Sequence, residues 1–249
     1  MELWIILPDI HDKHPERLAR KVYHPALQCA ERVIEAYKPA GIMYLGDATD
    51  MESLCYFDQD KRKLMEGRRY KKDIDSLKHM LDRHESLSPK SKRIYMIGNH
   101  EDRVRQYVEN HSEADGQMNF VEDAGIEKRG YEVVKYNDYK KLGKAIFIHG
   151  FDASAGHSAK MSRTYTSSVF YGHVHDIQST SAVNPAGEGQ IRIAASLGCL
   201  CDLNPKWMKN VPNKWLHGFG MFWLKSNGEF QMDTKSVIRG STIVNGKEF

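Results

Sequence analysis

The sequence has no apolar run long enough to cross a membrane. A membrane helix needs roughly 20 consecutive apolar residues, and no hydrophobic stretch of the chain approaches that length. We also expect no secretory signal, because Met1-Glu2 carries no positive charge and the apolar stretch 3–7 is too short. We therefore expect a cytoplasmic protein without a membrane partner.

Cysteine is scarce. A chain of 249 residues contains only Cys29, Cys55, Cys199 and Cys201. Such a chain can bury a sufficient core without disulfide bonds, so we expect free thiols in a reducing compartment. The pair Cys199-x-Cys201 has metal-site spacing, but no second pair accompanies it, which favours small buried residues over a metal site.

A strong charge imbalance, internal repeats and low-complexity segments are absent as well. The formal net charge of +3 is too small to indicate a nucleic-acid partner by itself. No shift in composition marks a boundary, so we expect one domain over residues 1–249, with an insertion at about 51–92. Within 60–93 twelve Lys/Arg face six Asp/Glu. This basic stretch is either a solvated helix face or a surface that attracts an anionic substrate, nucleic acid included.

Apolar runs alternate with helical patterns in the first half of the chain, which is typical of an α/β sheet with parallel strands. Helices are predicted over 16–37, over 61–85 with Leu64 on the buried face, and from about 102. Residues 112–130 are expected to be a surface connection and 137–143 a polar turn. Strands are predicted at 3–7, 42–45, 93–97, 131–136, 145–148, 168–171, 190–195, 218–224 and 230–238.

Polar side chains follow five of these strands directly, as Asp9, His11, Asp47, Asn99, His100, His149, His173 and His175. Burying such groups without partners costs several kcal/mol, so packing alone does not explain five strand ends of this kind. The mixture of carboxylate, imidazole and amide oxygen suits a divalent ion such as Mn, Fe or Zn. The ligands are too numerous for one tetrahedral ion, which favours two metals roughly 3.5–4 Å apart.

These residues belong to five motifs in fixed order, namely Asp9-x-His11, Gly46-Asp47-x-x-Asp50, Gly98-Asn99-His100-Glu101, His149 and Gly172-His173-x-His175. Together they resemble the calcineurin-like metallophosphoesterase superfamily, whose pattern is D-x-H, G-D-x-x-D, G-N-H-E, a lone H and G-H-x-H. Each motif alone is weak, whereas the ordered set over 9–175 is specific. The resemblance implies an α/β fold of four layers (αββα), with two mixed β-sheets flanked by helices. Compact size and the G-N-H-E-D-R string favour a phage or bacterial member.

The resemblance also implies a role for each matching residue. Asp9, His11 and His175 would hold the first metal, and Asn99, His149 and His173 the second, with Asp47 bridging both. A hydroxide between the metals would attack phosphorus, His100 would protonate the leaving oxygen, and Asp50 would orient His100. Manganese is the favoured metal, with Fe, Zn, Ni and Mg as alternatives.

The substrate is less defined than the reaction class. Arg103 is a candidate for a phosphate contact, and His157 and Lys160 are candidates to lie over the site. Trp207 and Trp215 are candidates for base stacking, whereas Trp223 fits a core strand. The leading hypothesis is a phosphoesterase acting on phosphomonoesters or phosphodiesters. The alternatives are a DNA nuclease or end-processing enzyme, and a non-catalytic scaffold.

Overall fold

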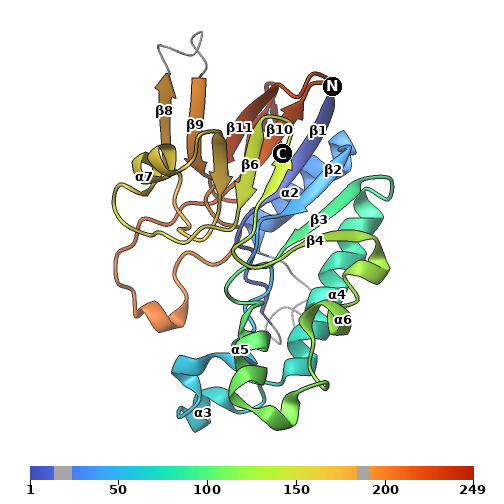
Figure 1. Cartoon of the computed structure of the whole chain (residues 1–249), viewed down its shortest axis with the longest axis vertical. Coiled ribbons are helices and arrows are strands. Elements are labelled where there is room, and N and C mark those ends of the chain that lie inside the picture. The colour runs from blue at the N-terminus through green and yellow to red at the C-terminus, as the bar shows by residue number, and fades with distance from the viewer. Residues whose placement is uncertain (14–23, 184–190) are drawn as a thin grey trace.

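The computed structural model describes residues 1–13, 24–183 and 191–249, and shows an α/β protein with two mixed β-sheets (Figure 1). The larger sheet has the order β11-β10-β1-β2-β3-β4. Its four neighbours β1 to β4 run parallel, and β10 and β11 extend it antiparallel beside β1. The strands are β1 (Glu2–Leu7), β2 (Gly41–Tyr44), β3 (Lys92–Met96), β4 (Tyr131–Val134), β10 (Gly218–Leu224) and β11 (Phe230–Ser236).

The smaller sheet has the order β5-β6-β7-β9-β8. Its central strands β6, β7 and β9 are parallel, and the two edge strands are antiparallel to their neighbours. Its strands are β5 (Lys140–Leu142), β6 (Ala145–Ile148), β7 (Ser168–Tyr171), β8 (Ser179–Val183) and β9 (Ile191–Ser196). A short hairpin of β12 (Ile243–Val244) and β13 (Lys247–Glu248) stands apart from both sheets.

Alternate residues of β1 point to opposite faces, as the period of a strand requires. Leu3, Ile5 and Leu7 pack with the helices α2 (Pro25–Tyr37), α4 (Tyr70–Leu87) and α6 (Phe120–Ala124). Trp4 and Ile6 pack against the smaller sheet. The other face of that sheet carries α7 (His157–Thr164), through Met161. Helices therefore cover the two outer faces and the sheets pack between them, an arrangement compatible with a sandwich (Figure 1).

The expected elements of the first half are present with altered limits. The helix predicted over 16–37 is described from Pro25 onward, where His24 caps the first turn, and 16–23 lie outside the described residues. The helix predicted over 61–85 is wrong as one unit. It is divided into α3 (Arg62–Met65) and α4, because Gly67 between them has a φ of +78°. Leu64 is 45% exposed instead of buried.

Residues 112–130 are more than a surface connection. They contain α6 and the short 3-10 turns Ser112–Ala114 and Glu127–Arg129. Phe120, Ala124 and Ile126 are buried in the main core. The segment 137–143 likewise contains a strand, β5, which pairs with β6.

The remaining short elements lie close to the strand ends. Helix α5 (Arg103–Asn110) begins one residue later than expected. Three further 3-10 turns span Glu52–Leu54, Tyr56–Asp58 and Lys206–Met208. Across the described ranges no helix is both long and apolar enough to cross a membrane.

Candidate metal centre

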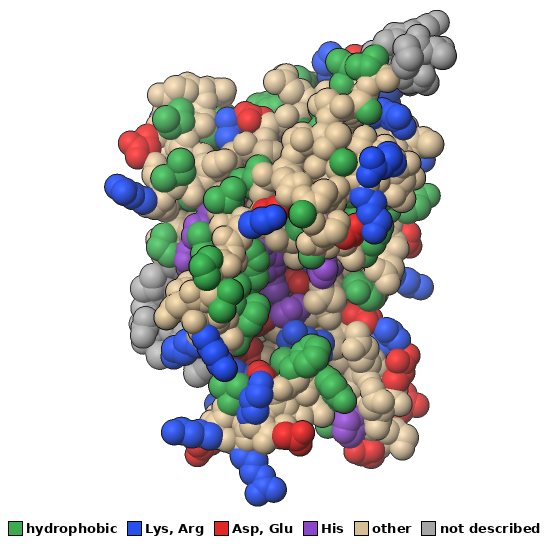
Figure 2. Space-filling model, turned by 90° about the vertical axis from the view of Figure 1, so that its left-hand side faces the viewer, with side chains coloured by type: hydrophobic (Ala, Val, Ile, Leu, Met, Phe, Trp, Pro, Cys, Tyr) green, Lys and Arg blue, Asp and Glu red, His purple; other side chains and the backbone are tan. Residues whose placement is uncertain are grey.

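The polar residues predicted to meet do lie together. Asp9 and His11 follow β1, Asp47 follows β2, Asn99 and His100 follow β3, His149 follows β6, and His173 and His175 follow β7. These strands are the parallel strands in the middle of the two sheets. Their carboxyl ends therefore lie at the same end of the molecule and surround one region. Figure 2 shows histidine and acidic side chains at the bottom of a hollow on this face, with hydrophobic side chains along its rim.

The first group consists of Asp9, His11 and His175. The Nε2 atoms of the two histidines are 3.1 Å apart. Oδ1 of Asp9 lies 3.3 Å from Nε2 of His175 and 4.0 Å from Nε2 of His11. Asp9 is completely buried, and its carboxylate also accepts the backbone N–H of His173 at 2.9 Å. One carboxylate oxygen and two imidazole nitrogens therefore face a shared point.

The second group consists of Asp47, Asn99, His149 and His173. Oδ1 of Asn99 lies 2.9 Å from Nε2 of His149 and 2.9 Å from Nδ1 of His173. Oδ2 of Asp47 is 3.4 Å from Nε2 of His149 and 3.7 Å from Nε2 of His11. Because His11 belongs to the first group, this carboxylate lies between the two groups.

The donor atoms of both groups need protons or a cation between them, because with neutral rings they face one another as acceptors. Nδ1 of His149 lies 2.9 Å from the Leu45 carbonyl, to which it can only donate. In a neutral ring Nε2 then presents a lone pair to the oxygens of Asn99 and Asp47, so acceptors face acceptors. His11 repeats the pattern, because Nδ1 lies 3.2 Å from Asp50 and Nε2 faces Nε2 of His175. A cation at each point satisfies these lone pairs, and second partners that fix the ring are usual for metal-binding histidines.

The titration of the histidines reflects the same surroundings. Burial and the neighbouring His100 lower the pKa of His11 to about 4. Burial also opposes the charge of His149 and His175, but Asp47 and Asp9 respectively outweigh it and raise the pKa of each ring to about 10. The two rings beside Asp47 and Asp9 therefore hold their protons at neutral pH, and a metal ion that binds to them must displace those protons.

The backbone at the centre has an unusual conformation. Asp9, His11, Asp47, His173 and His175 all have positive φ, between 40° and 69°. Two glycines permit the close approach of neighbouring loops. A Cβ at Gly98 would overlap the Asp47 carboxylate, and one at Gly172 would overlap the Asp9 carboxylate.

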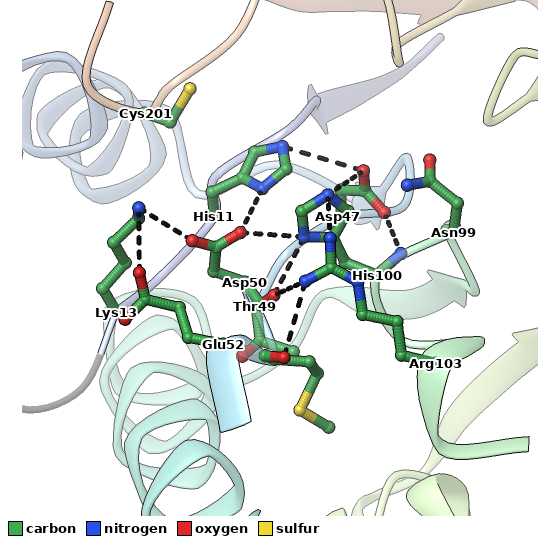
Figure 3. Close-up of polar contacts among 12 residues, drawn as sticks. His11, Lys13, Asp47, Thr49, Asp50, Glu52, Asn99, His100, Arg103 and Cys201 are labelled. Carbon is green, nitrogen blue, oxygen red and sulfur yellow. Dashed lines mark hydrogen bonds and ion pairs between the residues drawn. The ribbon is translucent and has the colours of Figure 1, made fainter. Parts of the chain in front are cut away.

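His100 stands beside the two groups and is held by Asp50 (Figure 3). Nδ1 of His100 lies 2.8 Å from Oδ1 of Asp50 and 2.9 Å from its carbonyl oxygen. Nε2 lies 3.9 Å from Oδ2 of Asp47. Burial and the Arg103 guanidinium lower the pKa of His100, but Asp47 and Asp50 outweigh them, so its pKa is raised. His100 can therefore carry a proton at the edge of the centre.

Arg103 and Lys13 brace Asp50 from two sides (Figure 3). The Arg103 guanidinium donates to the Asp50 carbonyl at 2.7 Å and lies 3.2 Å from Nε2 of His100. Nζ of Lys13 lies 2.8 Å from the Asp50 carboxylate and 3.3 Å from Glu52. Burial and His100 act in opposite directions on the pKa of Asp50, and the histidine contacts hold it well below its usual range. In this arrangement Arg103 contacts His100 and Asp50, two residues of the pocket wall.

Glu101 is a member of the centre that the sequence analysis assigned to no role. Its side chain is 1% exposed and accepts five hydrogen bonds. Oε2 accepts from the backbone N–H of Asp47 at 3.0 Å and of Gly98 at 2.8 Å. Oε1 accepts from Ala48, Thr49 and the hydroxyl of Tyr95, at 2.8, 3.3 and 3.0 Å. The carboxylate thus binds the loop after β2 to the loop after β3, and its place in Gly98-Asn99-His100-Glu101 was the available signal.

Two predicted substrate contacts lie elsewhere. His157 is 1% exposed and bonds to the Tyr171 hydroxyl at 2.7 Å and to Asp176 at 3.0 Å. It anchors α7 to the smaller sheet instead of covering the site. Nζ of Lys160 forms an ion pair with Asp152 at 2.7 Å on the surface. The ring of His157 points to Tyr171 and Asp176, Lys160, three residues further along the helix, pairs with Asp152, and neither residue lines the pocket at the candidate centre.

A pocket of about 210 Å³ opens above the two groups. Its walls include the centre itself and the side chains of Lys13, Cys201, Asp202, Pro205, Trp207 and Trp215. Cys199 and Cys201 are buried, as expected, and the Cys201 sulfur lies 3.8 Å from Nδ1 of His175.

The chain matches no family model. No curated protein matches it either.

Proposed function

We propose that the protein is a phosphoesterase that depends on two divalent metal ions. The observation that carries the proposal is the convergence of Asp9, His11 and His175 with Asp47, Asn99, His149 and His173, whose lone pairs face two shared points. Asp47 lies between them and would be common to both ions. Carboxylate, amide and imidazole donors accept several divalent ions, of which we propose manganese.

Bound at these points, two divalent ions would supply Lewis acidity toward phosphoryl oxygens and a water molecule of lowered pKa. The residues of the chain supply the rest. His100 gives its proton to the oxygen that leaves phosphorus, since its pKa is raised and its Nε2 faces the pocket side of Asp47. Asp50 accepts from Nδ1 and so presents Nε2 to the substrate.

The fold supports the same assignment. Two mixed sheets packed between helices, with ligands at the carboxyl ends of parallel strands, are what the calcineurin-like metallophosphoesterase superfamily would require. We therefore propose membership of that superfamily, with the four-layer αββα fold.

Purified protein tests the proposal with p-nitrophenyl phosphate and bis(p-nitrophenyl) phosphate, in the presence of Mn²⁺ and after EDTA treatment. We expect metal-dependent hydrolysis of at least one ester. Removal of a general acid typically costs 10²–10⁴-fold in rate, so His100→Ala should lose activity on that scale while still binding Mn²⁺. Asp47→Asn should lose both. His79→Ala, an exposed histidine of α4, is the control and should match the wild type. Full activity of both site variants refutes the proposal.

A DNA nuclease is the second candidate, favoured by one observation. The exposed rings of Tyr56 and Phe57, 77% and 82% accessible, precede by a few positions in the chain the basic residues 61–63 at the start of α3. Such a surface suits single strands, whose bases stack on aromatic rings. Incubation with single- and double-stranded DNA decides between the two, because a nuclease shows cleavage and binding that weakens steeply with salt.

A further inference from the structure

Two tryptophans form one wall of the pocket that contains the candidate metal centre. The centroid of the Trp215 ring lies 4.2 Å from that of the His175 ring, and the centroid of the Trp207 ring lies 6.0 Å from that of the Trp215 ring. Both indoles line the pocket together with Asp202. The aromatic wall, defined here as Trp207 and Trp215, thus contacts the metal-ligand candidate His175 through Trp215.

The segment that carries the wall is fixed to the centre at both ends. The backbone N–H of Leu200 donates to the Asp9 carbonyl at 3.0 Å, and that of Leu216 donates to the His175 carbonyl at 2.8 Å. Asn213 closes the segment on itself by donating to the Leu203 carbonyl at 2.8 Å. The wall therefore holds a defined position relative to Asp9 and His175.

The two indole rings differ in how much of their surface is exposed. Trp215 is half-buried between His175 and Trp207, whereas Trp207 is 65% exposed. Ligand pockets are typically lined by aromatic side chains together with a few convergent polar groups, and Trp207 lines a pocket that contains such groups. Its π-face can stack a planar ring, an interaction worth about 1–3 kcal/mol per base in nucleic-acid complexes.

We propose that Trp207 stacks the base of a nucleoside phosphate whose phosphate group lies at the candidate metal centre. This substrate class rests on the phosphoesterase assignment above. Trp215 is the indole in ring contact with His175, whereas Trp207 contacts Trp215, so a base stacked on Trp207 is set off from a phosphate group at the centre. A sugar between phosphate and base supplies that spacing. Asp202 offers acceptor oxygens for sugar hydroxyls or amino groups of the base, and its charge disfavours a second phosphate there.

Binding of adenosine 5′-monophosphate and ribose 5-phosphate, measured by isothermal titration with Mn²⁺-loaded protein, tests the inference. The two probes share phosphate and sugar, so their affinity ratio isolates the base. We expect the wild type to bind the nucleotide at least tenfold more tightly. Trp207→Ala should abolish most of that ratio, and Trp207→Phe, which keeps a planar ring, should preserve most of it. Val211→Ala, an exposed residue of the same segment outside the pocket wall, is the matched control.

Each other outcome overturns the inference. Equal affinity of the wild type for both probes, or binding of neither, means that no base subsite exists. An equal loss of affinity for both probes in Trp207→Ala means that Trp207 supports the fold of the segment only. Titration does not require turnover, so a protein that binds the nucleotide through Trp207 but hydrolyses no ester would refute the phosphoesterase assignment and leave the subsite in place.

Discussion

Replacing Glu101 by glutamine tests how the candidate centre is held in shape. The two side chains have the same size, but glutamine presents one oxygen and one NH₂ group where the carboxylate presents two acceptors. Oε2 accepts two backbone N–H groups, from Asp47 and Gly98, and Oε1 accepts three donors. The glutamine NH₂ group therefore faces either two donors or three. The orientation that faces two is less damaging, and it places NH₂ against the N–H groups of Asp47 and Gly98.

The magnitude follows from those two contacts. A buried donor that loses its partner costs about 1–3 kcal/mol, so two such donors predict a loss of about 2–6 kcal/mol in the free energy of unfolding. Urea denaturation at neutral pH measures it. Because one of the two donors belongs to Asp47, we also expect weaker Mn²⁺ binding in titration calorimetry, in contrast to a purely structural defect elsewhere.

Glu109→Gln is the control, since Glu109 is exposed and contacts Arg105 on the surface of α5. Exposed ion pairs contribute roughly 0–1 kcal/mol, so this variant should remain near the wild type. If Glu101→Gln unfolds within about 1 kcal/mol of the wild type and binds Mn²⁺ unchanged, the carboxylate does not hold the two loops together.

Three further predictions concern the same region. Gly98→Ala should reduce Mn²⁺ affinity and activity together, since its Cβ overlaps the Asp47 carboxylate; unchanged calorimetric binding would contradict this. Burial raises the pKa of Asp73 to about 6 despite hydrogen bonds from Ser53, so stability should fall as pH rises from about 4 to about 6. Asp73→Asn should lack that fall, and its free energy of unfolding should exceed that of the wild type by about 2–3 kcal/mol at pH 7.5. Urea denaturation of both proteins at pH 4 and pH 7.5 measures the difference. Metal binding must displace the proton that His149 holds with a pKa of about 10, so Mn²⁺ affinity should rise with pH, up to tenfold per unit per proton released; equal affinity at pH 6 and pH 8 would exclude this.

The positions of the candidate ligands were predictable from the sequence because each comes directly after a short apolar strand. In parallel strands the carboxyl ends meet at one edge, so strand limits correct to within one or two residues were sufficient. Asp9, Asp47, Asn99, His149 and His173 are brought together on that basis alone.

Features that depend on long-range backbone contacts escaped the sequence analysis. Strand β8 has a mostly polar sequence and forms through pairing with β9, which no local pattern encodes. Glu101 acts on the amides of residues some 50 positions away. His157 carries the same chemistry as the ligand histidines, and only its burial against Tyr171 and Asp176 separates it from them.

The left-handed backbone at Asp9, His11, Asp47, His173 and His175 has a consequence for the economy of the fold. Conformations of this kind cost of order 1 kcal/mol or more at each non-glycine residue, and the net stability of a domain is only about 5–15 kcal/mol. The five residues at the candidate centre thus lower the free energy of unfolding of the metal-free protein, and bound cations would offset that loss. Glycine at one of these positions would stabilise the metal-free protein but would remove a candidate metal ligand. Stability and metal binding therefore make opposite demands on the same five residues.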